Sequence, residues 1–240
     1  MSAILFGSIS TLVDSSELQR RAFNTAFSQH GLDWSWDQEE YAALLTGNGG
    51  QDRVAAYAEQ RGDDVDAAAV HATKSEVFRT LLAEEAPEPR AGVVETIRAA
   101  KEAGHRLGFV TTTSADNVAA VLKVPGLSAA DFDVVVDADD VDEPKPAAEA
   151  YRHALAALGE HASDAVAVED NTGGVASARA AGLPVVAFPN TNTADHDWSE
   201  ATERVVALER GDAPSWSSTR RSTRCTATTP RPTSPTTTSS

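Results

Sequence analysis

Residues 4–15 read ILFGSISTLVDS, and this stretch decides how the N-terminal part of the chain is expected to fold. Together with Ala3, its first three residues form a short apolar run, which predicts a buried parallel strand over Ala3–Phe6. Small and polar residues follow from Gly7 onward and end the strand. In an open α/β sheet, ligands bind beyond the carboxyl ends of the strands, so the loop after Phe6 is a candidate binding segment.

Short apolar runs alternate with amphipathic helical patterns through most of the remaining chain. This alternation predicts a Rossmann-like α/β fold, in which a doubly wound parallel sheet carries helices on both faces. We expect Gly7, Thr111 and Asp170 to lie at the carboxyl ends of strands. The further predicted strands cover 107–111, 134–136, 165–168 and 185–188, and the predicted helices cover 92–103, 116–123, 147–158 and 172–181.

One long segment interrupts the alternation. Residues 16–85 carry helical patterns over 17–30, 38–45, 51–61 and 66–82, with no convincing strand between them. We therefore predict an α/β core domain formed by 1–15 and 86–210, with an inserted all-helical cap domain over 16–85. An insertion placed directly after a strand would cover the binding edge as a lid, exclude water and select substrates.

The composition changes after Gly211. Residues 211–240 contain four arginines against one acidic residue, and Ser, Thr and Pro dominate them. Because large apolar side chains are nearly absent, we predict a disordered low-complexity tail. A basic binding arm would have this composition, and so would a shifted reading frame or a decayed gene end. A shifted reading frame or a decayed gene end fits the abruptness of the change slightly better than a binding arm does.

The net charge of −16 argues against nucleic acid as a partner, since phosphate backbones require clustered Lys and Arg. The apolar runs have the length of strands, so we expect neither a membrane span nor a secretory leader. A lone Cys225 fits a reducing compartment, and we expect a cytoplasmic protein. Four lysines among many acidic residues favour a halophilic, salt-adapted surface, although an ordinary solvated acidic face gives the same pattern.

Three further motifs follow the first. They read FVTTTS at 109–114, PKP at 144–146 and VEDNTGG at 168–174. In this order and spacing, the four motifs resemble those of the haloacid dehalogenase-like hydrolases, in the branch with a helical cap that includes β-phosphoglucomutase and the CbbY-type sugar-phosphate phosphatases. The resemblance covers residues 3–208.

The resemblance implies a phosphatase whose first motif is degenerate. In this family the motif is Asp-x-Asp-x-Thr, where the first aspartate attacks the phosphate and the second acts as acid and base. These positions fall on Gly7 and Ile9, neither of which can perform that chemistry. Asp14 lies seven residues beyond the nucleophile position, at the expected hinge into the cap, and is not expected to substitute. No catalytic residue is intact, and we expect little or no activity.

The expected phosphate-binding residues are Thr111, Thr112 and Lys145. Thr111 can donate its hydroxyl to a phosphate oxygen, and the backbone N–H groups of Thr112 and Thr113 follow it before a helix begins. A Thr-rich turn that only caps a helix would look the same, but the other motifs favour phosphate contact. Lys145 lies between Pro144 and Pro146 and resembles the family lysine that neutralises the phosphate.

Glu169 and Asp170 occupy the positions where the family places its metal-binding carboxylates. Mg²⁺ prefers oxygen ligands and retains several waters. Since position 7 offers no carboxylate, we expect Mg²⁺ binding to be weak or lost, with the backbone carbonyl of Ile9 as a remaining ligand. A solvated acidic turn is the alternative for this pair. The glycines at 173 and 174 are expected to let the next helix pack closely.

In the cap, residues 46–53 read TGNGGQDR and resemble the substrate-specificity loop of the CbbY-type branch. Arg53 is the candidate substrate residue, because a guanidinium can clamp a second phosphate. An ordinary helix-surface arginine is an equally good interpretation. Trp34 and Trp36 are expected in the cap core rather than at a sugar. Asn117 is expected to begin a helix or frame the site.

Three functions remain open from the sequence. The protein is a weakly active sugar-phosphate phosphatase, a pseudoenzyme that binds a small phosphorylated metabolite such as a sugar phosphate, or a decayed copy without selected activity. The missing nucleophile favours impaired catalysis, while the remaining motifs favour a retained phosphate pocket.

Overall fold

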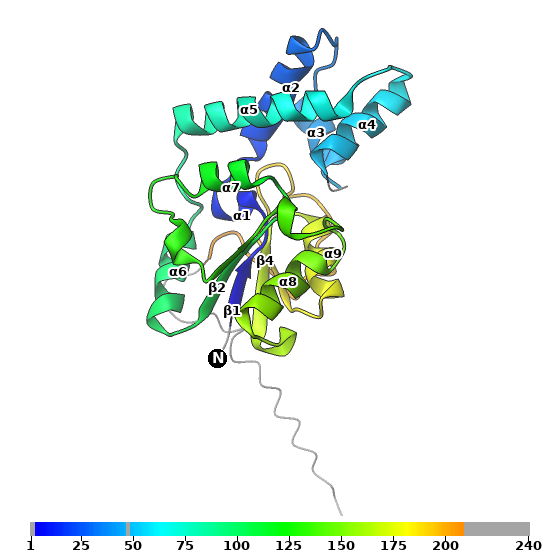
Figure 1. Ribbon diagram of the computed structural model, residues 1–240. Coiled ribbons are helices and arrows are strands. Elements are labelled where there is room, and N and C mark those ends of the chain that lie inside the picture. Colours follow the sequence, from blue (N-terminus) through cyan, green and yellow to red (C-terminus); the bar gives the residue numbers. More distant parts are fainter. Residues whose placement is uncertain (1–2, 47–48, 209–240) are drawn as a thin grey trace, which may run out of the picture.

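The computed structural model describes residues 3–46 and 49–208, and the tail predicted at 211–240 lies outside them. Figure 1 shows an α/β part with β1 at its centre and a helical part stacked on one end of it. Nine α-helices and six strands occur in the described ranges. The predicted α/β fold with an inserted all-helical cap is confirmed.

Six parallel strands form one sheet in the order β3-β2-β1-β4-β5-β6. β1 is central, and Phe6 pairs with Phe109 on one side and Val168 on the other. The unpredicted β6 has only two residues, both exposed, so it carries no apolar run. The strands are β1 Ala3–Phe6, β2 Arg106–Val110, β3 Val134–Val136, β4 Ala165–Glu169, β5 Val185–Ala187 and β6 Glu203–Arg204.

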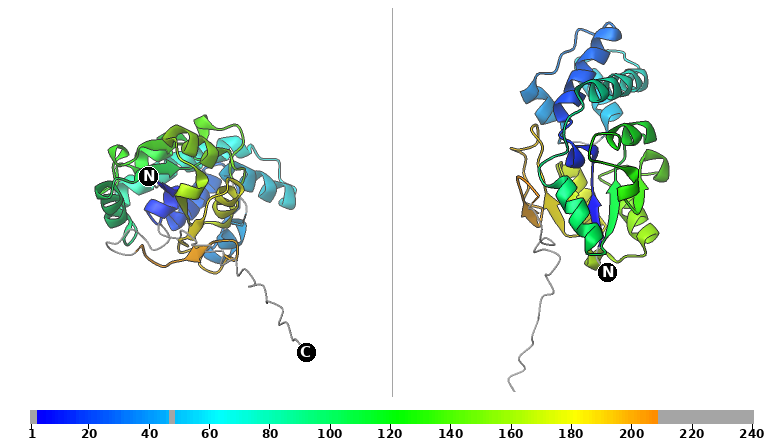
Figure 2. Two further views of the ribbon diagram at one scale, coloured as in Figure 1. Left: turned by 90° about the horizontal axis from the view of Figure 1, so that it is seen from below. Right: turned by 90° about the vertical axis from the view of Figure 1, so that its left-hand side faces the viewer.

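Alternate side chains of β1 enter two separate cores, because successive residues of a strand face opposite sides of the sheet. Ile4 and Phe6 pack on one face with α6 and α7, whereas Ala3 and Leu5 pack on the other with α8 and α9. Figure 2 shows helices on both sides of the sheet. The covering helices are α6 Val93–Glu102, α7 Ala115–Val121, α8 Glu149–Leu158 and α9 Thr172–Ala180.

The cap has its own aromatic core. Trp34 and Trp36 are buried, with 4% and 0% of their surface exposed, and the rings of Phe27 and Trp36 meet edge to face at 4.6 Å. This confirms that the two tryptophans belong to the cap core. The cap helices are α2 Ser16–Gln29, α3 Gln38–Leu44, α4 Gly50–Arg61 and α5 Ala67–Glu85.

A one-turn helix that the sequence did not predict, α1 Ile9–Leu12, follows the first strand. The hydroxyl of Ser8 caps it by accepting a hydrogen bond from the backbone N–H of Ser10 at 3.2 Å. Because the chain turns into this helix, the side chain of Ile9 enters the apolar core and is only 5% exposed. Three 3₁₀ segments complete the described structure: Ala129–Asp131, Ala138–Asp140 and Ala162–Asp164.

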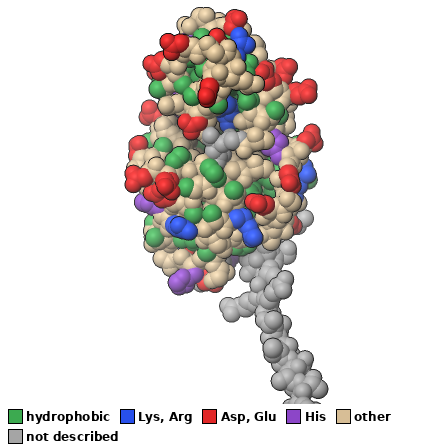
Figure 3. Space-filling model, turned by 90° about the vertical axis from the view of Figure 1, so that its right-hand side faces the viewer, with side chains coloured by type: hydrophobic (Ala, Val, Ile, Leu, Met, Phe, Trp, Pro, Cys, Tyr) green, Lys and Arg blue, Asp and Glu red, His purple; other side chains and the backbone are tan. Residues whose placement is uncertain are grey.

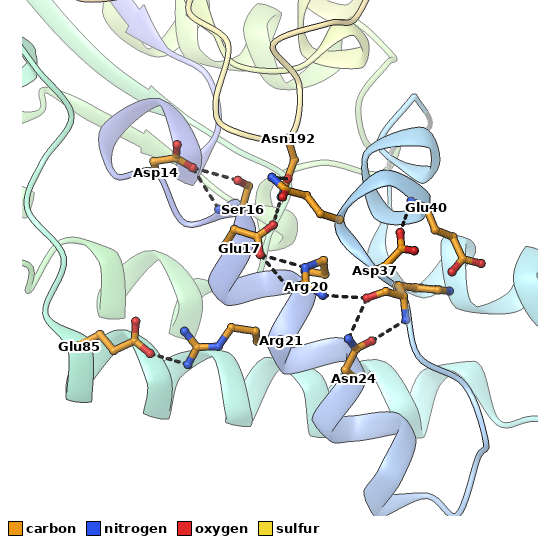
Figure 4. A network of polar contacts seen from close by, with 12 residues as sticks. Asp14, Ser16, Glu17, Arg20, Arg21, Asn24, Asp37, Glu40, Glu85 and Asn192 are labelled. Carbon is orange, nitrogen blue, oxygen red and sulfur yellow. Dashed lines mark hydrogen bonds and ion pairs between the residues drawn. The ribbon is translucent and has the colours of Figure 1, made fainter.

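Polar contacts join the cap to the α/β core. The loop after β5 brings Asn192 to Glu17 of α2 at 2.7 Å (Figure 4). The same Asn192 accepts from Gln38 of α3 at 3.1 Å. On another side, Arg79 of α5 donates to Asn117 of α7 at 3.2 Å. The cap therefore lies over the carboxyl end of the sheet, as a lid would. No helix in the described ranges is long and apolar enough to span a bilayer.

Acidic side chains are spread over the molecular face seen in Figure 3, with few basic side chains among them. Several acidic side chains of the protein pair with basic groups at the surface, such as Asp133 with Arg106 at 2.6 Å. Such exposed pairs contribute little to stability, so they explain the surface composition but not the fold.

Candidate functional site

The carboxyl ends of the three central strands bring the motifs together. The backbone N–H of Gly7 donates to the carbonyl of Val168 at 2.7 Å, so the loop after β1 lies against the end of β4. Lys145 reaches the same place from the loop before α8, and its ammonium donates to the carbonyl of Val110 at the end of β2 at 2.9 Å. Three segments far apart in the sequence thus converge at one edge of the sheet.

Glu169 forms the centre of a buried polar cluster. Its Oε1 accepts hydrogen bonds from the Lys145 ammonium and from the Tyr151 hydroxyl, both at 2.6 Å. Glu169 and Tyr151 are fully buried, at 0% exposed, and Lys145 is 5% exposed. Burial raises the pKa of Glu169, and the positive charge of Lys145 opposes that rise. The same burial, with the nearby carboxylate, raises the pKa of Tyr151 well above its usual value.

Two glycines make room for this carboxyl group. A Cβ atom on Gly7 would stand 2.1 Å from Cδ of Glu169, and a Cβ atom on Gly174 would stand at the same distance. No side chain fits at either position while Glu169 keeps this orientation. The expectation that Gly174 permits close packing is therefore confirmed, and the group that packs against it is the carboxyl of Glu169. Its Oε2 accepts no hydrogen bond from the described residues.

Asp170 is held differently from its neighbour. It is 3% exposed and accepts hydrogen bonds from three neutral side chains. Ser8 and Asn171 donate to Oδ1, the latter at 3.0 Å, while Asn190 donates to Oδ2 at 2.6 Å. Both carboxylate oxygens are thus engaged by protein groups.

The loop after β2 places the threonines of the second motif. β2 ends at Val110, so Thr111 begins the loop rather than ending the strand as predicted. The hydroxyl of Thr111 accepts from the backbone N–H of Thr113 at 3.3 Å, and Asn117 donates to the Thr113 hydroxyl at 3.0 Å. Asn117 thus frames the loop. Thr111 is buried, whereas Thr112 is half-buried.

The carboxylates present do not fit a tightly held Mg²⁺. Within residues 3–46 and 49–208, no three His, Cys, Asp or Glu side chains gather as a metal site would require. Glu169 is paired with Lys145, and the oxygens of Asp170 are taken by hydrogen-bond donors. Apart from a backbone carbonyl such as that of Ile9, waters would have to supply the remaining oxygen ligands of an Mg²⁺ ion here.

A second basic cluster lies in the cap. Arg53 donates through Nε to the carbonyl of Leu44 at 2.9 Å and lies 6.0 Å from the ring centre of Phe23. Lys74 donates to the side chain of Gln19 and lies 4.8 Å from the same ring centre. Burial, with a smaller contribution from Arg53, lowers the pKa of Lys74 to about 7.

Another titratable neighbour of Lys74 and Arg53 is His71 on α5. Burial, with Lys74 and Arg53 adding to the effect, lowers the pKa of His71 to about 4. Burial lowers the pKa of Arg53 as well. A nearby anion would stabilise the charged forms of these basic groups, which burial and neighbouring positive charges disfavour. The cluster is therefore suited to an acidic ligand.

Lys74, His71 and Tyr151 belong to these clusters but were not singled out in the sequence. Lys74 occupies a position in the apolar stripe of α5, between Val70 and Phe78 at four-residue spacing, and a lysine there is a detectable signal. Tyr151 lies among the buried residues of α8, where nothing in the pattern marks it as polar.

The remaining predicted positions lie outside the polar cluster. Ile9 packs in the apolar core, and Arg53 lies in the cap. Asp14 follows α1 and accepts from the hydroxyls of Ser16 at 2.9 Å and Thr191 at 2.5 Å (Figure 4 shows the contact with Ser16). Its carboxylate is therefore engaged by hydroxyl donors at the entry to the cap.

Comparisons with known proteins agree with this geometry. A family model described as haloacid dehalogenase-like hydrolase matches residues 1–182. Protein CbbY of Cereibacter sphaeroides is 41% identical over 204 residues, which cover 83% of this chain and 89% of that protein. Protein CbbY of Rhodobacter capsulatus is 37% identical over 213 residues, covering 87% and 94%.

Solved structures give the same relationship. The crystal structure of CbbY from Rhodobacter sphaeroides in complex with phosphate has a TM-score of 0.79 and 39% identity, and the match covers 87% of this chain and 95% of that one. A mutant of that protein in complex with xylulose-(1,5)bisphosphate has a TM-score of 0.81 and 38% identity, with the same coverage.

Proposed function

Because the chain belongs to the haloacid dehalogenase-like hydrolases, we propose that it is a member with an impaired hydrolytic centre that still binds a phosphorylated sugar. One observation carries the proposal. The position at which the family has its attacking aspartate is Gly7, and the space beside it holds the buried carboxyl group of Glu169.

Glu169 does not replace the lost nucleophile in this proposal. A nucleophile must reach the phosphorus atom, whereas this carboxyl group is fully buried and is held by Lys145 and Tyr151. Ile9, at the acid–base position, is apolar and packed in the core. Removing both a nucleophile and its proton donor typically lowers the rate by several orders of magnitude.

Two basic regions support binding of a phosphorylated sugar. In the core, Lys145 and the hydroxyl of Thr111 lie at the carboxyl end of the sheet, where ligands of such folds bind. In the cap above it, the half-buried Arg53 and the buried Lys74 lie near the same aromatic ring, that of Phe23. The related CbbY was solved with phosphate and with a sugar bisphosphate, and we extend that ligand class to this protein.

A phosphatase assay tests the impairment. Purified protein is incubated with Mg²⁺ and either p-nitrophenyl phosphate or a panel of sugar phosphates, at high salt because of the acidic composition. We expect turnover no greater than that of Lys145→Ala. Robust Mg²⁺-dependent turnover that Lys145→Ala abolishes would show that the catalytic centre is intact in some other form.

Restoring the two aspartates tests whether the rest of the centre is sound. We expect Gly7→Asp with Ile9→Asp to gain Mg²⁺-dependent hydrolysis once Glu169 moves away from position 7. The matched control is Gly7→Asn with Ile9→Asp, which introduces a side chain of the same size without a nucleophile. Equal activity of the two variants would mean that the damage extends beyond the first motif.

Calorimetric titration distinguishes a binding protein from a decayed copy. The ligands are inorganic phosphate, xylulose 1,5-bisphosphate and several monophosphorylated sugars, each titrated into the protein at high salt. We expect saturable binding that Lys145→Ala weakens. A failure of every ligand to bind would remove the proposed binding function and favour a chain without selected activity.

A further inference from the structure

The acidic groups of the pocket already have partners within the protein. Glu169 pairs with Lys145, and Asp170 accepts from three neutral donors. We propose that the pocket binds its phosphorylated ligand without a divalent cation, with Lys145 and the donors around Asp170 in the place of the metal. This inference rests on the proposed function, because it concerns the same phosphate-binding pocket.

A count of charges favours metal-free binding. Relative to the family motif, this chain lacks two carboxylates, at Gly7 and Ile9, which together would carry two negative charges. A bound Mg²⁺ would carry two positive charges. If both aspartates and the Mg²⁺ ion are absent, the net charge that an incoming phosphate meets is the same as when all three are present. The repulsion that the two family aspartates would add is therefore absent, and only that of Asp170 remains.

The hydrogen bonds at Asp170 give the geometric reason. Ser8 directly follows Gly7, and its hydroxyl donates to Oδ1 of Asp170. Asn190 donates to Oδ2 at 2.6 Å. These two donors stabilise the carboxylate from opposite oxygens, as a cation would. A metal at Asp170 would have to share these oxygens with the donors, and the described residues offer no cluster of three His, Cys, Asp or Glu side chains to complete a metal site.

The orientation of Glu169 is a second, independent reason. Its carboxyl group points into the space beside Gly7 and Gly174, and its Oε1 is held by Lys145 and Tyr151. To serve as a ligand it would have to leave both donors. Since removing one partner of a buried ion pair is costly, a weakly bound cation would not compensate for that change.

Calorimetry with and without a metal chelator tests the inference. The probes are inorganic phosphate and xylulose 1,5-bisphosphate, titrated in excess EDTA and again in excess Mg²⁺. We expect the two dissociation constants to agree within about threefold. Affinity that is about tenfold or more tighter in Mg²⁺ would overturn metal-free binding while leaving the proposed function standing. Absence of binding in both buffers would overturn the proposed function, and this inference with it.

An Asp170→Asn variant distinguishes metal-free binding of phosphate from metal-dependent binding. In a metal-free pocket, removing this negative charge should tighten phosphate binding in EDTA, by about threefold. In a metal-dependent pocket the same change removes a ligand and weakens binding. Asp164→Asn is the matched control, because Asp164 is exposed and lies before β4, at the opposite end of the strand. Circular dichroism checks that both variants fold.

Direct titration of the protein with Mn²⁺, followed by electron paramagnetic resonance, does not depend on any phosphorylated ligand. We expect no saturable Mn²⁺ binding to the wild-type protein. Saturable binding that Asp170→Asn abolishes and Asp164→Asn preserves would overturn the inference.

Discussion

The carboxyl carbon of Glu169 lies 2.1 Å from the point where a Cβ atom on Gly7 would stand. A side chain at position 7 and the observed orientation of Glu169 therefore exclude each other. The space left by the missing side chain is occupied by a neighbouring carboxyl group, which is neutralised by Lys145. The degenerate first motif and the Glu169–Lys145 pair are thus parts of one structural arrangement.

Gly7→Ala should lower the free energy of unfolding by about 2 kcal/mol, as overpacking of a well-filled site does. Gly7 is not among the glycines with positive φ, so backbone strain does not contribute to this cost. Urea denaturation measures the change. An unaltered midpoint and slope would mean that Glu169 moves aside at no cost.

A double-mutant cycle shows whether Glu169 is the cause. Glu169→Ala removes the carboxyl group that the new Cβ would meet, so Gly7→Ala should cost about 1 kcal/mol less in that background. Strict additivity of the two changes would contradict the steric explanation.

Lys145→Met should cost about 3–5 kcal/mol, because it leaves the buried Glu169 without its counter-ion. Adding Glu169→Gln should recover part of that loss, since a glutamine carries no charge and can still accept from Tyr151. Thermal and urea denaturation measure both variants.

Lys101→Met is the matched control. Lys101 forms a 2.7 Å pair with Asp131 at the surface, where 47% of the lysine side chain is exposed. Its loss should cost no more than about 1 kcal/mol. Similar costs for the two lysine substitutions would mean that burial does not govern the Lys145 pair.

Much of the fold was predictable because burial on both faces makes parallel strands continuous apolar runs. The predicted strands match the observed ones to within one residue at each end, and the helical segments agree to within three. The exceptions are short. α1 has four residues and β6 has two, and neither length allows a periodic pattern to appear.

The motif residues of the candidate site were predictable, but Tyr151 and the contacts among these residues were not. The motifs identified Lys145, Glu169 and Asp170, which the structure places at one edge of the sheet. The rotation of Glu169 toward Gly7 depends on the absence of a side chain there and on a tyrosine 18 residues earlier. The orientation of the Glu169 side chain toward Gly7 could therefore not be predicted from the sequence alone.

Arg79→Ala should weaken binding of xylulose 1,5-bisphosphate about threefold while changing stability by no more than about 1.5 kcal/mol. The guanidinium of Arg79 on α5 donates to Asn117, which in turn donates to Thr113 in the loop that follows Thr111. Losing the first bond uncouples the cap from that loop. Calorimetry and urea denaturation give the two quantities.

Arg98→Ala is the control for the cap contact, because Arg98 is exposed on α6 and belongs to the α/β core. It should leave the affinity for the bisphosphate unchanged. A loss of affinity of equal size in both variants would assign the effect to the overall charge of the protein rather than to the link between cap and loop.

Lys74 should take up a proton when an anionic ligand binds beside it. Its pKa is about 7 in the free protein, so at about pH 8.5 most molecules carry a neutral Lys74. A phosphate group favours the charged form and raises this pKa, so binding is accompanied by proton uptake, and affinity falls as pH rises above 7. Titration of xylulose 1,5-bisphosphate in buffers of different ionisation enthalpy measures the number of protons.

The neighbours of Lys74 do not produce the same signal. His71, with a pKa of about 4, stays neutral at this pH, Arg53 stays charged, and Gln19 does not titrate. Lys74→Arg keeps a positive charge at every pH and should abolish the proton uptake, whereas Lys101→Arg at the surface should not change it. Equal proton uptake in the wild-type protein and in Lys74→Arg would mean that another group takes up the proton and that the bound anion does not raise the pKa of Lys74.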